Sequence, residues 1–454
     1  MKTIGIGLLG FGTVGTGVVL GLQKNRALLQ SRTGFDLELR RVADLDLDRD
    51  RGISLPDGVL SRDAEGLVDS PEVDVVVELI GGLQAARSLI QRALRRGKPV
   101  VTANKALLAE HGAELFALAE RHGADIYFEA SVGGGIPLIR SLRDGLVSNN
   151  IRSLYGILNG TCNYILASME QHRLSCAAAL KEAQKAGYAE ADPALDVDGL
   201  DTAHKAVILA SLAYGFPVPM QAVGVEGIRG LEALDLRYAL ELGYRIKMLA
   251  VIEQTGDAVA VRVHPTLVPV GHILASVMGV FNAVLIDGDG VGDVLCYGQG
   301  AGRDPTASAI LSDVVESART LAGQATRRSP GFGASGAGVR MQASDDSDVR
   351  YYLRLTLLDK PGVFGQVAQV LGRHGISIAS VLQKENLAGR HVPVILITHH
   401  ARQQAFRAAL EELNTLPVVG APAVRLRIED FDSRRAGGRP PRADRGASEA
   451  AEGA

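Results

Sequence analysis

The stretch Thr3-Ile-Gly-Ile-Gly-Leu-Leu9, followed directly by Gly10-Phe-Gly-Thr-Val-Gly15, decides the fold of the first part of the chain. Its first half is a short apolar run that predicts a buried strand, and residues 18–29 predict a helix. Between them, the glycines of a G-x-G-x-x-G pattern allow a tight turn and the close approach of a pyrophosphate to the helix N-terminus. We therefore expect a dinucleotide-binding loop formed by Gly10, Phe11, Gly12, Thr13, Val14 and Gly15.

Strand-like and helix-like segments alternate after this loop. Residues 73–79 (VDVVVEL) form a near-continuous β-branched run, which is typical of a parallel strand covered on both faces. The alternation predicts a doubly wound, Rossmann-type α/β domain over residues 1–135. Its other elements are expected as strands at 36–43 and 99–102 and as helices at 88–96 and 110–122.

The pattern changes after about residue 131. Helices are expected up to about residue 214 and strands after it, so residues 136–304 are interpreted as a second, α+β domain that binds the substrate. The glycine-rich segment 298–302 precedes a predicted helix, 305–322, which is expected to pack back on the first domain.

The C-terminal third has three parts. Residues 323–348 are rich in Gly, Ser and Asp, which predicts a linker. Residues 349–430 show a βαββαβ order, which predicts a ferredoxin-like fold. Residues 431–454 are rich in Arg, Gly, Pro and Ala, which predicts a disordered tail.

The bulk properties exclude several classes of protein. A chain of 454 residues is too long for one core. A formal net charge of −3 argues against a general nucleic-acid binder. No apolar stretch is long enough for a membrane span, and Met1-Lys2 leads directly into the first strand, so we expect neither a membrane partner nor a signal peptide. Three scattered cysteines fit a reducing cytoplasm without a disulfide framework.

A second informative stretch is Gly199-Leu-Asp-Thr-Ala-His-Lys205, which places Asp201 and Lys205 one helical turn apart on the same face. This face is apolar one turn further on, so we expect Lys205 to be only partly hydrated. A lysine kept from water gives up its proton more readily. Beside a dinucleotide site, such a lysine suggests an alcohol–carbonyl oxidoreductase. The alternative is an ordinary helix salt bridge worth about 0.3–0.5 kcal/mol.

Other polar residues leave alternatives open. Asp44, at the end of the second strand, would accept from ribose hydroxyls and favour NAD, whereas Arg49 and Arg51 would pair with a 2′-phosphate and favour NADP. We favour NAD. Lys105 follows a strand end, where ligands of such sheets bind, although a surface lysine is the simpler interpretation. Residues 187–198 crowd four carboxylates into a loop that would suit an ammonium group or a cation, or is simply acidic.

Seven motifs, in this order, are similar to those of the homoserine dehydrogenase family. They are GFGTVG (10–15), TANK (102–105), EASVGGGIP (129–137), GILNGTCNYI (156–165), GYAEADP (187–193), GLDTAHK (199–205) and GAGRDPT (300–306). The set covers about the first 320 residues and is highly specific. The C-terminal module, with Asp359-Lys-Pro-Gly-Val363, resembles an ACT regulatory domain, as in the long bacterial form of that family.

The resemblance implies NAD(P)-dependent interconversion of L-homoserine and L-aspartate 4-semialdehyde, in threonine, methionine and isoleucine biosynthesis. Lys205 would be the proton donor in reduction and the base in oxidation, and Asp201 would orient it and contact the substrate. Further substrate contacts would come from Gly187, Glu190, Lys105 and Thr161, with Glu190 taking the ammonium group. Lys105 and Gly302 would also line the cofactor.

The resemblance further implies a structural sodium ion, held by Glu129 and the backbone carbonyls of Val132, Gly134 and Ile136, since a hard cation prefers oxygen ligands. NADP-preferring members carry a basic residue just after Asp44, but this chain has Leu45. This departure argues against NADP preference.

An ACT-like module implies feedback by an amino acid, most simply threonine. It would bind at a domain interface near Gly362 and residues 375–380. The family also implies a cytoplasmic homodimer or homotetramer that assembles through the second domain.

Two rival interpretations come from other classes. Cys162 would be the thiolate of a cysteine-dependent semialdehyde dehydrogenase, although cysteine is more often a small buried residue. A non-catalytic amino-acid sensor would use only the C-terminal module, which leaves the Lys205 helix and the glycine loops without a purpose.

Overall fold

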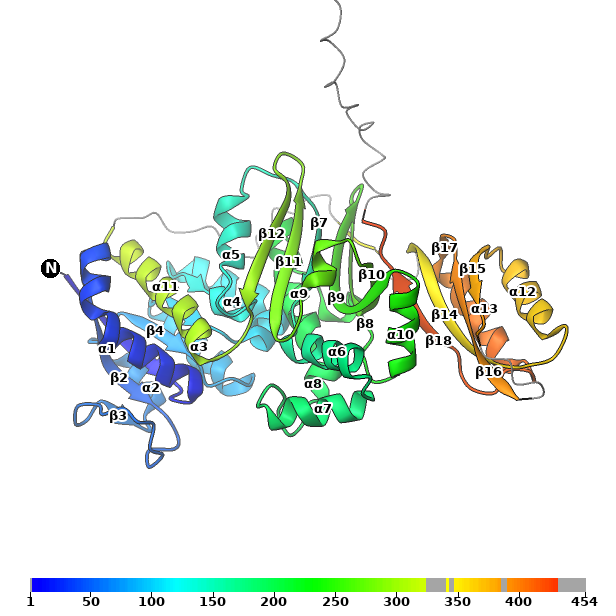
Figure 1. Ribbon diagram of the computed structural model, residues 1–454. Coiled ribbons are helices and arrows are strands. Elements are labelled where there is room, and N and C mark those ends of the chain that lie inside the picture. The colour runs from blue at the N-terminus through cyan, green and yellow to red at the C-terminus, as the bar shows by residue number, and fades with distance from the viewer. Residues whose placement is uncertain (1, 324–339, 343–346, 385–389, 432–454) are drawn as a thin grey trace, which may run out of the picture.

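The computed structural model describes residues 2–323, 340–342, 347–384 and 390–431 (Figure 1). Most of the predicted linker at 323–348, and nearly all of the predicted tail at 431–454, lie outside the described residues. No helix within the described residues is both long and apolar enough to cross a membrane.

The N-terminal domain is built on a parallel six-stranded sheet with the strand order β3-β2-β1-β4-β5-β6. The chain reverses direction across the sheet beside β1, which opens a crevice at the carboxyl ends of the strands. This order confirms the predicted Rossmann-type sheet. Its elements are β1 (Lys2–Leu9), α1 (Thr13–Thr33), β2 (Phe35–Ala43), β3 (Leu60–Ser61), α2 (Ala64–Asp69), β4 (Val75–Glu78), α3 (Gln84–Arg95), β5 (Val100–Thr102), α4 (Lys105–His122) and β6 (Ile126–Tyr127).

Helix α4 begins five residues earlier than the apolar periodicity predicts. The Asn104 side chain accepts a hydrogen bond from the Leu107 backbone N–H at 3.1 Å, which caps the helix. Lys105 is therefore the first helical residue and lies at the carboxyl end of the sheet rather than in a connecting loop.

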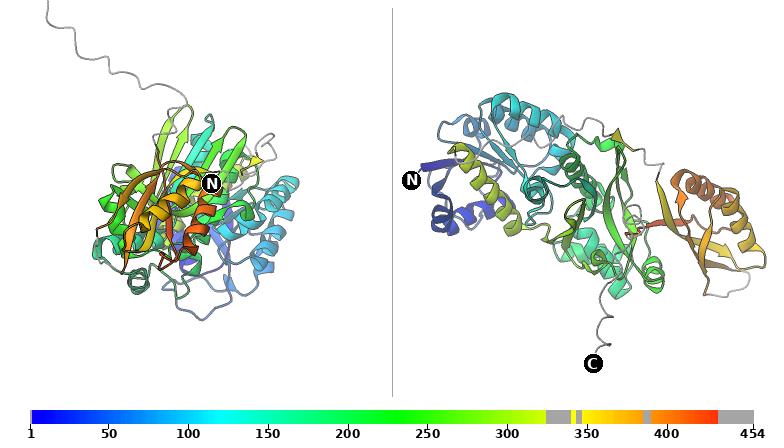
Figure 2. Two further views of the ribbon diagram at one scale, coloured as in Figure 1. Left: turned by 90° about the vertical axis from the view of Figure 1, so that its right-hand side faces the viewer. Right: turned by 90° about the horizontal axis from the view of Figure 1, so that it is seen from above.

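Helix α11 (Arg303–Leu321) packs along α1 at the face of this domain (Figures 1 and 2). Two glycines of α1 permit the close contact. A Cβ on Gly17 would lie 2.8 Å from the Arg303 side chain, and one on Gly21 would lie 2.5 Å from Leu311. The chain that follows β12 (Gly292–Gln299) thus returns to the N-terminal domain.

The second domain has an antiparallel sheet with the order β12-β11-β7-β9-β10. Its longest hairpin, β9–β10, pairs over twelve residues on each strand. Its strands are β7 (Ile151–Ile157), β8 (Gly224–Val225), β9 (Tyr244–Thr255), β10 (Ala258–Pro269), β11 (Phe281–Gly288) and β12 (Gly292–Gln299). Its helices are α5 (Leu138–Arg140), α6 (Gly160–His172), α7 (Cys176–Lys185), α8 (Ala194–Val197), α9 (Leu200–Tyr214) and α10 (Ala233–Glu241), with short helical turns η1 (Glu129–Ser131), η2 (Ser141–Gly145), η3 (Met220–Ala222) and η4 (Ile273–Ser276).

The C-terminal unit has the predicted βαββαβ order, with the sheet order β18-β14-β16-β15. Its sheet continues that of the second domain, because β18 pairs in parallel with β10 at two positions. The unit is therefore joined to the second domain by backbone pairing. Its elements are β14 (Asp348–Leu358), α12 (Val363–Arg373), β15 (Ile378–Leu382), β16 (His391–Thr398), β17 (Ala401–Arg402), α13 (Gln403–Thr415) and β18 (Val424–Ile428), and β13 (Arg340–Met341) pairs with β10.

Ion pairs cross this junction below the surface. Arg354 on β14 donates to both carboxylate oxygens of Asp235 on α10, at 2.6 and 3.1 Å. Asp235 is 0% exposed and Arg354 7%. Glu226 lies 2.9 Å from a guanidinium nitrogen of each of two arginines on β18, Arg425 and Arg427. The junction is thus a packed interface as well as a shared sheet.

Candidate active site

The predicted catalytic pair lies on α9, at the seam between the first two domains. Gly199 precedes this helix with a φ of 87°, and a Cβ there would lie 2.7 Å from the Met248 side chain. Lys205 Nζ donates to Asp201 Oδ2 at 2.7 Å and to the Leu158 carbonyl at 2.7 Å. Lys205 is 8% exposed and Asp201 6%, so this pair is shielded from water and is not a solvated helix salt bridge.

A second lysine reaches the same carboxylate from the N-terminal domain. Lys105 Nζ lies 2.9 Å from Asp201 Oδ1. The turn before α4 places it there: Asn104 caps the helix, and the Thr102 hydroxyl donates to the buried Glu78 carboxylate at 2.6 Å. The predicted substrate- and cofactor-binding lysine is thus brought to the predicted catalytic pair.

The charges at this point depend on one another. Burial favours the neutral form of Asp201, but the ammonium groups of Lys205 and Lys105 outweigh burial and hold the pKa of Asp201 below its usual range. Burial likewise opposes the charge of Lys105, but Asp201 outweighs it and raises the pKa of Lys105. One ionised carboxylate therefore faces two ammonium groups.

Asn159 and Asp196 complete this set. Asn159 was not predicted as a site residue, and Asp196 was predicted only as one of the four carboxylates of the 187–198 loop. Asn159 Nδ2 donates to Asp196 Oδ1 at 2.7 Å and to Asp201 Oδ2 at 2.8 Å. Asp196 lies on α8, where burial raises its pKa. An Asn before a helical run is typical of an N-cap, and Asn159 caps α6. Its contacts with two carboxylates depend on tertiary packing, which the sequence pattern does not show.

The loop at 187–193 borders the site. The Thr161 hydroxyl donates to the Tyr188 carbonyl at 2.6 Å, and Gly187 has a φ of 77°. The negative charge of Glu190 contributes to the raised pKa of Lys105, after the larger effects of burial and Asp201. The predicted substrate contact Thr161 is therefore tied to the loop that carries Gly187 and Glu190, and the charge of Glu190 acts on Lys105.

The glycine loop has the geometry that a dinucleotide requires. Gly10 has a φ of 95° and donates its N–H to the Ala43 carbonyl at 2.8 Å. A Cβ on Gly15 would lie 2.3 Å from the Gly10 carbonyl oxygen. Gly12 precedes α1 without a side-chain cap, and no atom lies within 4 Å of the position of its Cβ. The uncapped helix N-terminus and the open space at Gly12 fit a pyrophosphate, beside Phe11, Thr13 and Val14 of the same turn.

Two of the three predicted determinants of cofactor choice, Asp44 and Arg51, lie beside this loop. Asp44 accepts from the Phe11 N–H at 2.5 Å and from the Asp46 N–H at 2.8 Å. The Arg51 guanidinium lies over the Phe11 ring, 4.8 Å from its centre, and 3.5 Å from Asp44. Arg49 is exposed. Arg51, rather than Arg49, is therefore the arginine that the fold places next to Asp44.

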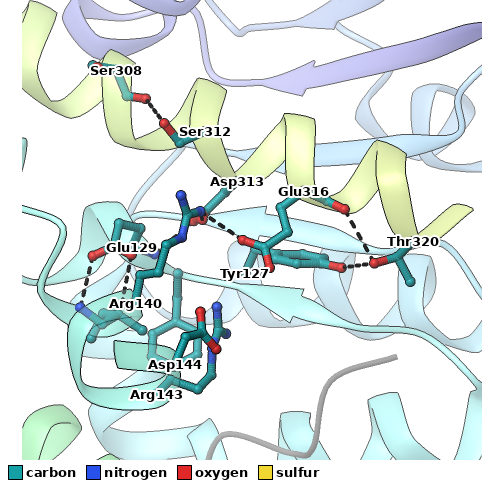
Figure 3. Close-up of polar contacts among 12 residues, drawn as sticks. Tyr127, Glu129, Arg140, Arg143, Asp144, Ser308, Ser312, Asp313, Glu316 and Thr320 are labelled. Atoms are coloured by element: carbon teal, nitrogen blue, oxygen red, sulfur yellow. Dashed lines mark hydrogen bonds and ion pairs between the residues drawn. The ribbon is translucent and has the colours of Figure 1, made fainter. Parts of the chain in front are cut away.

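The predicted sodium loop follows the first domain directly. Glu129 is buried, and its carboxylate accepts from the backbone N–H groups of Ile139 and Arg140 at 2.8 and 3.0 Å. Figure 3 shows Arg140 reaching back to Glu316 on α11, at 2.8 Å. Burial raises the pKa of Glu129, so a nearby cation would favour its charged form. The other predicted ligands, the carbonyls of Val132, Gly134 and Ile136, lie in the same loop, and the Ile136 carbonyl accepts from the Leu138 N–H at 2.7 Å.

Among the described residues, no group of three or more His, Cys, Asp and Glu side chains is arranged to hold a metal ion.

Gly302 lies where the two domains meet. It precedes α11 with a φ of 114°. A Cβ on Gly134 would lie 2.5 Å from the Gly300 carbonyl, and Arg303 packs on Gly17 of α1. The second glycine-rich loop thus lies between the sodium loop and the helix that begins at the dinucleotide loop.

Cys162 does not suit nucleophilic catalysis. It is fully buried, and its thiol donates to the Asp196 carbonyl at 3.2 Å. Burial, together with the charges of Asp196 and Asp201, raises the pKa of Cys162 well above its usual value. A thiolate is the reactive form, so the geometry disfavours a cysteine-dependent dehydrogenase.

A dinucleotide loop at one edge of the crevice and a shielded lysine–carboxylate pair at the other define a nicotinamide-dependent oxidoreductase. Comparison with known proteins identifies the family. The family model for the homoserine dehydrogenase NAD-binding domain matches residues 10–129, the homoserine dehydrogenase model matches residues 137–315, and the ACT domain model matches residues 351–418. The chain belongs to the homoserine dehydrogenase family and carries a C-terminal ACT domain.

Relatives over the full length support this assignment. Homoserine dehydrogenases of Neisseria gonorrhoeae and Pseudomonas aeruginosa are each 42% identical and cover 95% of this chain and 100% of their own. A crystal structure of homoserine dehydrogenase from Thiobacillus denitrificans has a TM-score of 0.88 at 42% identity, over 95% of this chain and 99% of that one. The protein is thus a homoserine dehydrogenase-type oxidoreductase.

Proposed function

We propose that the lysine–carboxylate cluster interconverts L-homoserine and L-aspartate 4-semialdehyde. The bound nicotinamide supplies hydride to the aldehyde carbon in reduction and accepts it from the alcohol carbon in oxidation. Lys205 gives its proton to the substrate oxygen in reduction and removes the hydroxyl proton in oxidation. Two of its three N–H bonds point to Asp201 and Leu158, so one is left for the substrate.

Asp201 orients both lysines in this proposal. Lys105, which comes from the nucleotide-binding domain, lies where a side chain would touch both cofactor and substrate. Glu190 takes the ammonium group of the substrate, and Thr161 with the backbone at Gly187 borders the same pocket. The contact that carries the proposal is the one between Lys105 and Asp201, since it joins the two domains at one point.

The cofactor site accepts both NAD and NADP in this proposal. Asp44 would accept from the ribose hydroxyls of NAD, and Arg51 would pair with the 2′-phosphate of NADP. A hyperthermophilic archaeal homoserine dehydrogenase, 27% identical and with a TM-score of 0.59, has been solved in complex with NADPH. It covers 70% of this chain and 98% of its own. The proximity of Arg51 to Asp44 supports use of either cofactor.

We further propose a structural sodium ion at Glu129, feedback by threonine through the ACT domain, and a cytoplasmic homodimer or homotetramer. The buried carboxylate beside carbonyl donors supports the cation, and the shared sheet supports coupling between the ACT domain and the second domain. Inhibition by L-threonine in initial-rate assays tests the feedback, and rates that do not change would remove it.

The experiment that tests the activity is initial-rate formation of reduced nicotinamide from L-homoserine, with NAD and NADP run in parallel. Turnover is expected with both, and their ratio measures cofactor preference. Folded protein that turns over homoserine with neither cofactor would contradict the proposed reaction.

A further inference from the structure

We propose that Asn159 is a positioning residue, which holds the carboxylates of Asp201 and Asp196 in place beside the two lysines by donating a hydrogen bond to each. The proposal rests on the proposed roles of Lys205 and Asp201. It adds a residue whose side chain orients the reacting groups without itself touching the substrate.

The orientation of the Asn159 amide follows from its three contacts. The Cys162 backbone N–H donates to Asn159 Oδ1 at 2.7 Å, which identifies that atom as the oxygen. The other amide atom lies 2.7 Å from Asp196 and 2.8 Å from Asp201, and ionised carboxylates only accept. Both amide hydrogens are therefore committed, one to each carboxylate.

These two hydrogen bonds oppose the free-energy cost of burying two carboxylates close together. Burial raises the pKa of Asp196, the charge of Asp201 raises it further, and the Asn159 hydrogen bond opposes both effects. Asp201 is also almost fully buried. Two negative charges in one buried site repel each other and lose their hydration. An amide that donates a hydrogen bond to each carboxylate lowers this cost.

The same turn also holds the lysine. Leu158, the residue before Asn159, accepts a hydrogen bond from Lys205 at 2.7 Å through its backbone carbonyl. The turn from β7 into α6 therefore contacts Lys205 through its backbone and Asp201 through a side chain. It holds both members of the catalytic pair in one geometry.

Substitutions at Asn159 separate positioning from helix capping. Asn, Asp and Ser are about equally good N-caps, so Asn159→Ser and Asn159→Asp keep an acceptor for Cys162 and lose the donors. A capping role predicts nearly wild-type behaviour for both. The matched control is Ser175→Ala, which removes the side-chain cap of α7, where Ser175 accepts from Ala178.

We expect Asn159→Ser to lower kcat about 10- to 100-fold, the effect of losing hydrogen bonds to charged groups. Loss of the donor raises the pKa of Asp196 further, beyond the rise that burial causes, so the acid limb of the kcat pH profile should move to higher pH. Asn159→Asp should lose more activity than Asn159→Ser, because it adds a third carboxylate. Ser175→Ala should leave the acid limb in place.

Thermal unfolding supplies a readout that does not need turnover. The destabilisation by Asn159→Ser should be larger at pH 8, where Asp196 is charged, than at an acid pH at which Asp196 takes up a proton. An acid limb in its wild-type position, or equal destabilisation at both pH values, would overturn the proposal while leaving the reaction intact. Wild-type protein that does not turn over homoserine would instead contradict the proposed function, and the unfolding comparison alone would then decide the role of Asn159.

Discussion

Replacing Asp235 by Asn should loosen the attachment of the ACT domain. The substitution keeps an acceptor of similar size but removes the charge that faces Arg354, which is 7% exposed. Breaking a buried ion pair costs about 3–5 kcal/mol. Glu232 lies 3.0 Å from Arg354 and is largely exposed, so it offsets part of the loss. We expect the free energy of unfolding to fall by about 3 kcal/mol. This corresponds to a fall in Tm of about 6–12 °C for a domain of about 150–250 residues.

The assay is thermal unfolding of the full chain, with a second variant to isolate the charge. Asp235→Asn combined with Arg354→Met removes both charges, so most of the stability should return. The matched control is Lys384→Gln, which breaks the exposed pair with Glu241 at the same junction and should cost less than about 1 kcal/mol. The reasoning is refuted when Asp235→Asn costs no more than this control, or when the double variant is as unstable as the single one.

Three further outcomes are expected. Lys205→Met should lower kcat about 100- to 10,000-fold in folded protein, the usual contribution of a general acid–base group, and a smaller loss in stopped-flow rates would place proton transfer elsewhere. Asp44→Ser should raise the kcat/KM ratio of NADP to NAD and Arg51→Gln should lower it, and ratios that do not move in opposite directions would contradict the assignment. Burial, with the charge of Glu129, raises the pKa of Asp313 to about 7, so the folded state keeps a proton between about pH 4 and 7 that the unfolded state has lost. Asp313 therefore lowers stability as pH rises through that window, and Asp313→Asn should reduce the slope; parallel Tm–pH curves for the two proteins would count against it.

The junction also decides how regulation can be tested. Removing the ACT domain by truncation near residue 348 would leave Asp235 and Glu226 without the arginines that they contact. It would also remove the strand that pairs with β10. If a truncated enzyme no longer responded to threonine, the cause could be loss of the threonine site or loss of packing at the junction. Point substitutions in the full chain separate these two causes.

The glycine loop and the alternation of strands and helices were predictable because each rests on local pattern. A glycine at Gly10 and an apolar run before it determine a turn and a strand without reference to the rest of the chain. The start of α4 was less predictable, since Asn104 extends the helix beyond the apolar stripe that marks it. The continuity of β10 with β18 was not predictable, because two residues of backbone pairing across a long separation leave no periodic trace.

The candidate site shows the same division. The spacing of Asp201 and Lys205 on one helix face is a local property, and it indicated the pair directly. Lys105 lies on another domain, and Asn159 lies in a strand-to-helix turn 42 residues before Asp201. Their convergence depends on how the domains pack, which no local pattern shows. Lys105 was predicted from its place after a strand end and from motif resemblance, and Asn159 was assigned no role.

The contacts of Asp201 also limit what it can do for the substrate. Its carboxylate already accepts from Lys205, Lys105 and Asn159, which uses about three of its roughly four lone-pair positions. Lys205 retains an N–H that these contacts do not use. The fold thus commits Asp201 mainly to orientation and leaves the lysine to meet the reacting oxygen. A substrate contact by Asp201 would occupy the one lone-pair position that remains. Replacing Asp201 should therefore affect kcat more than KM.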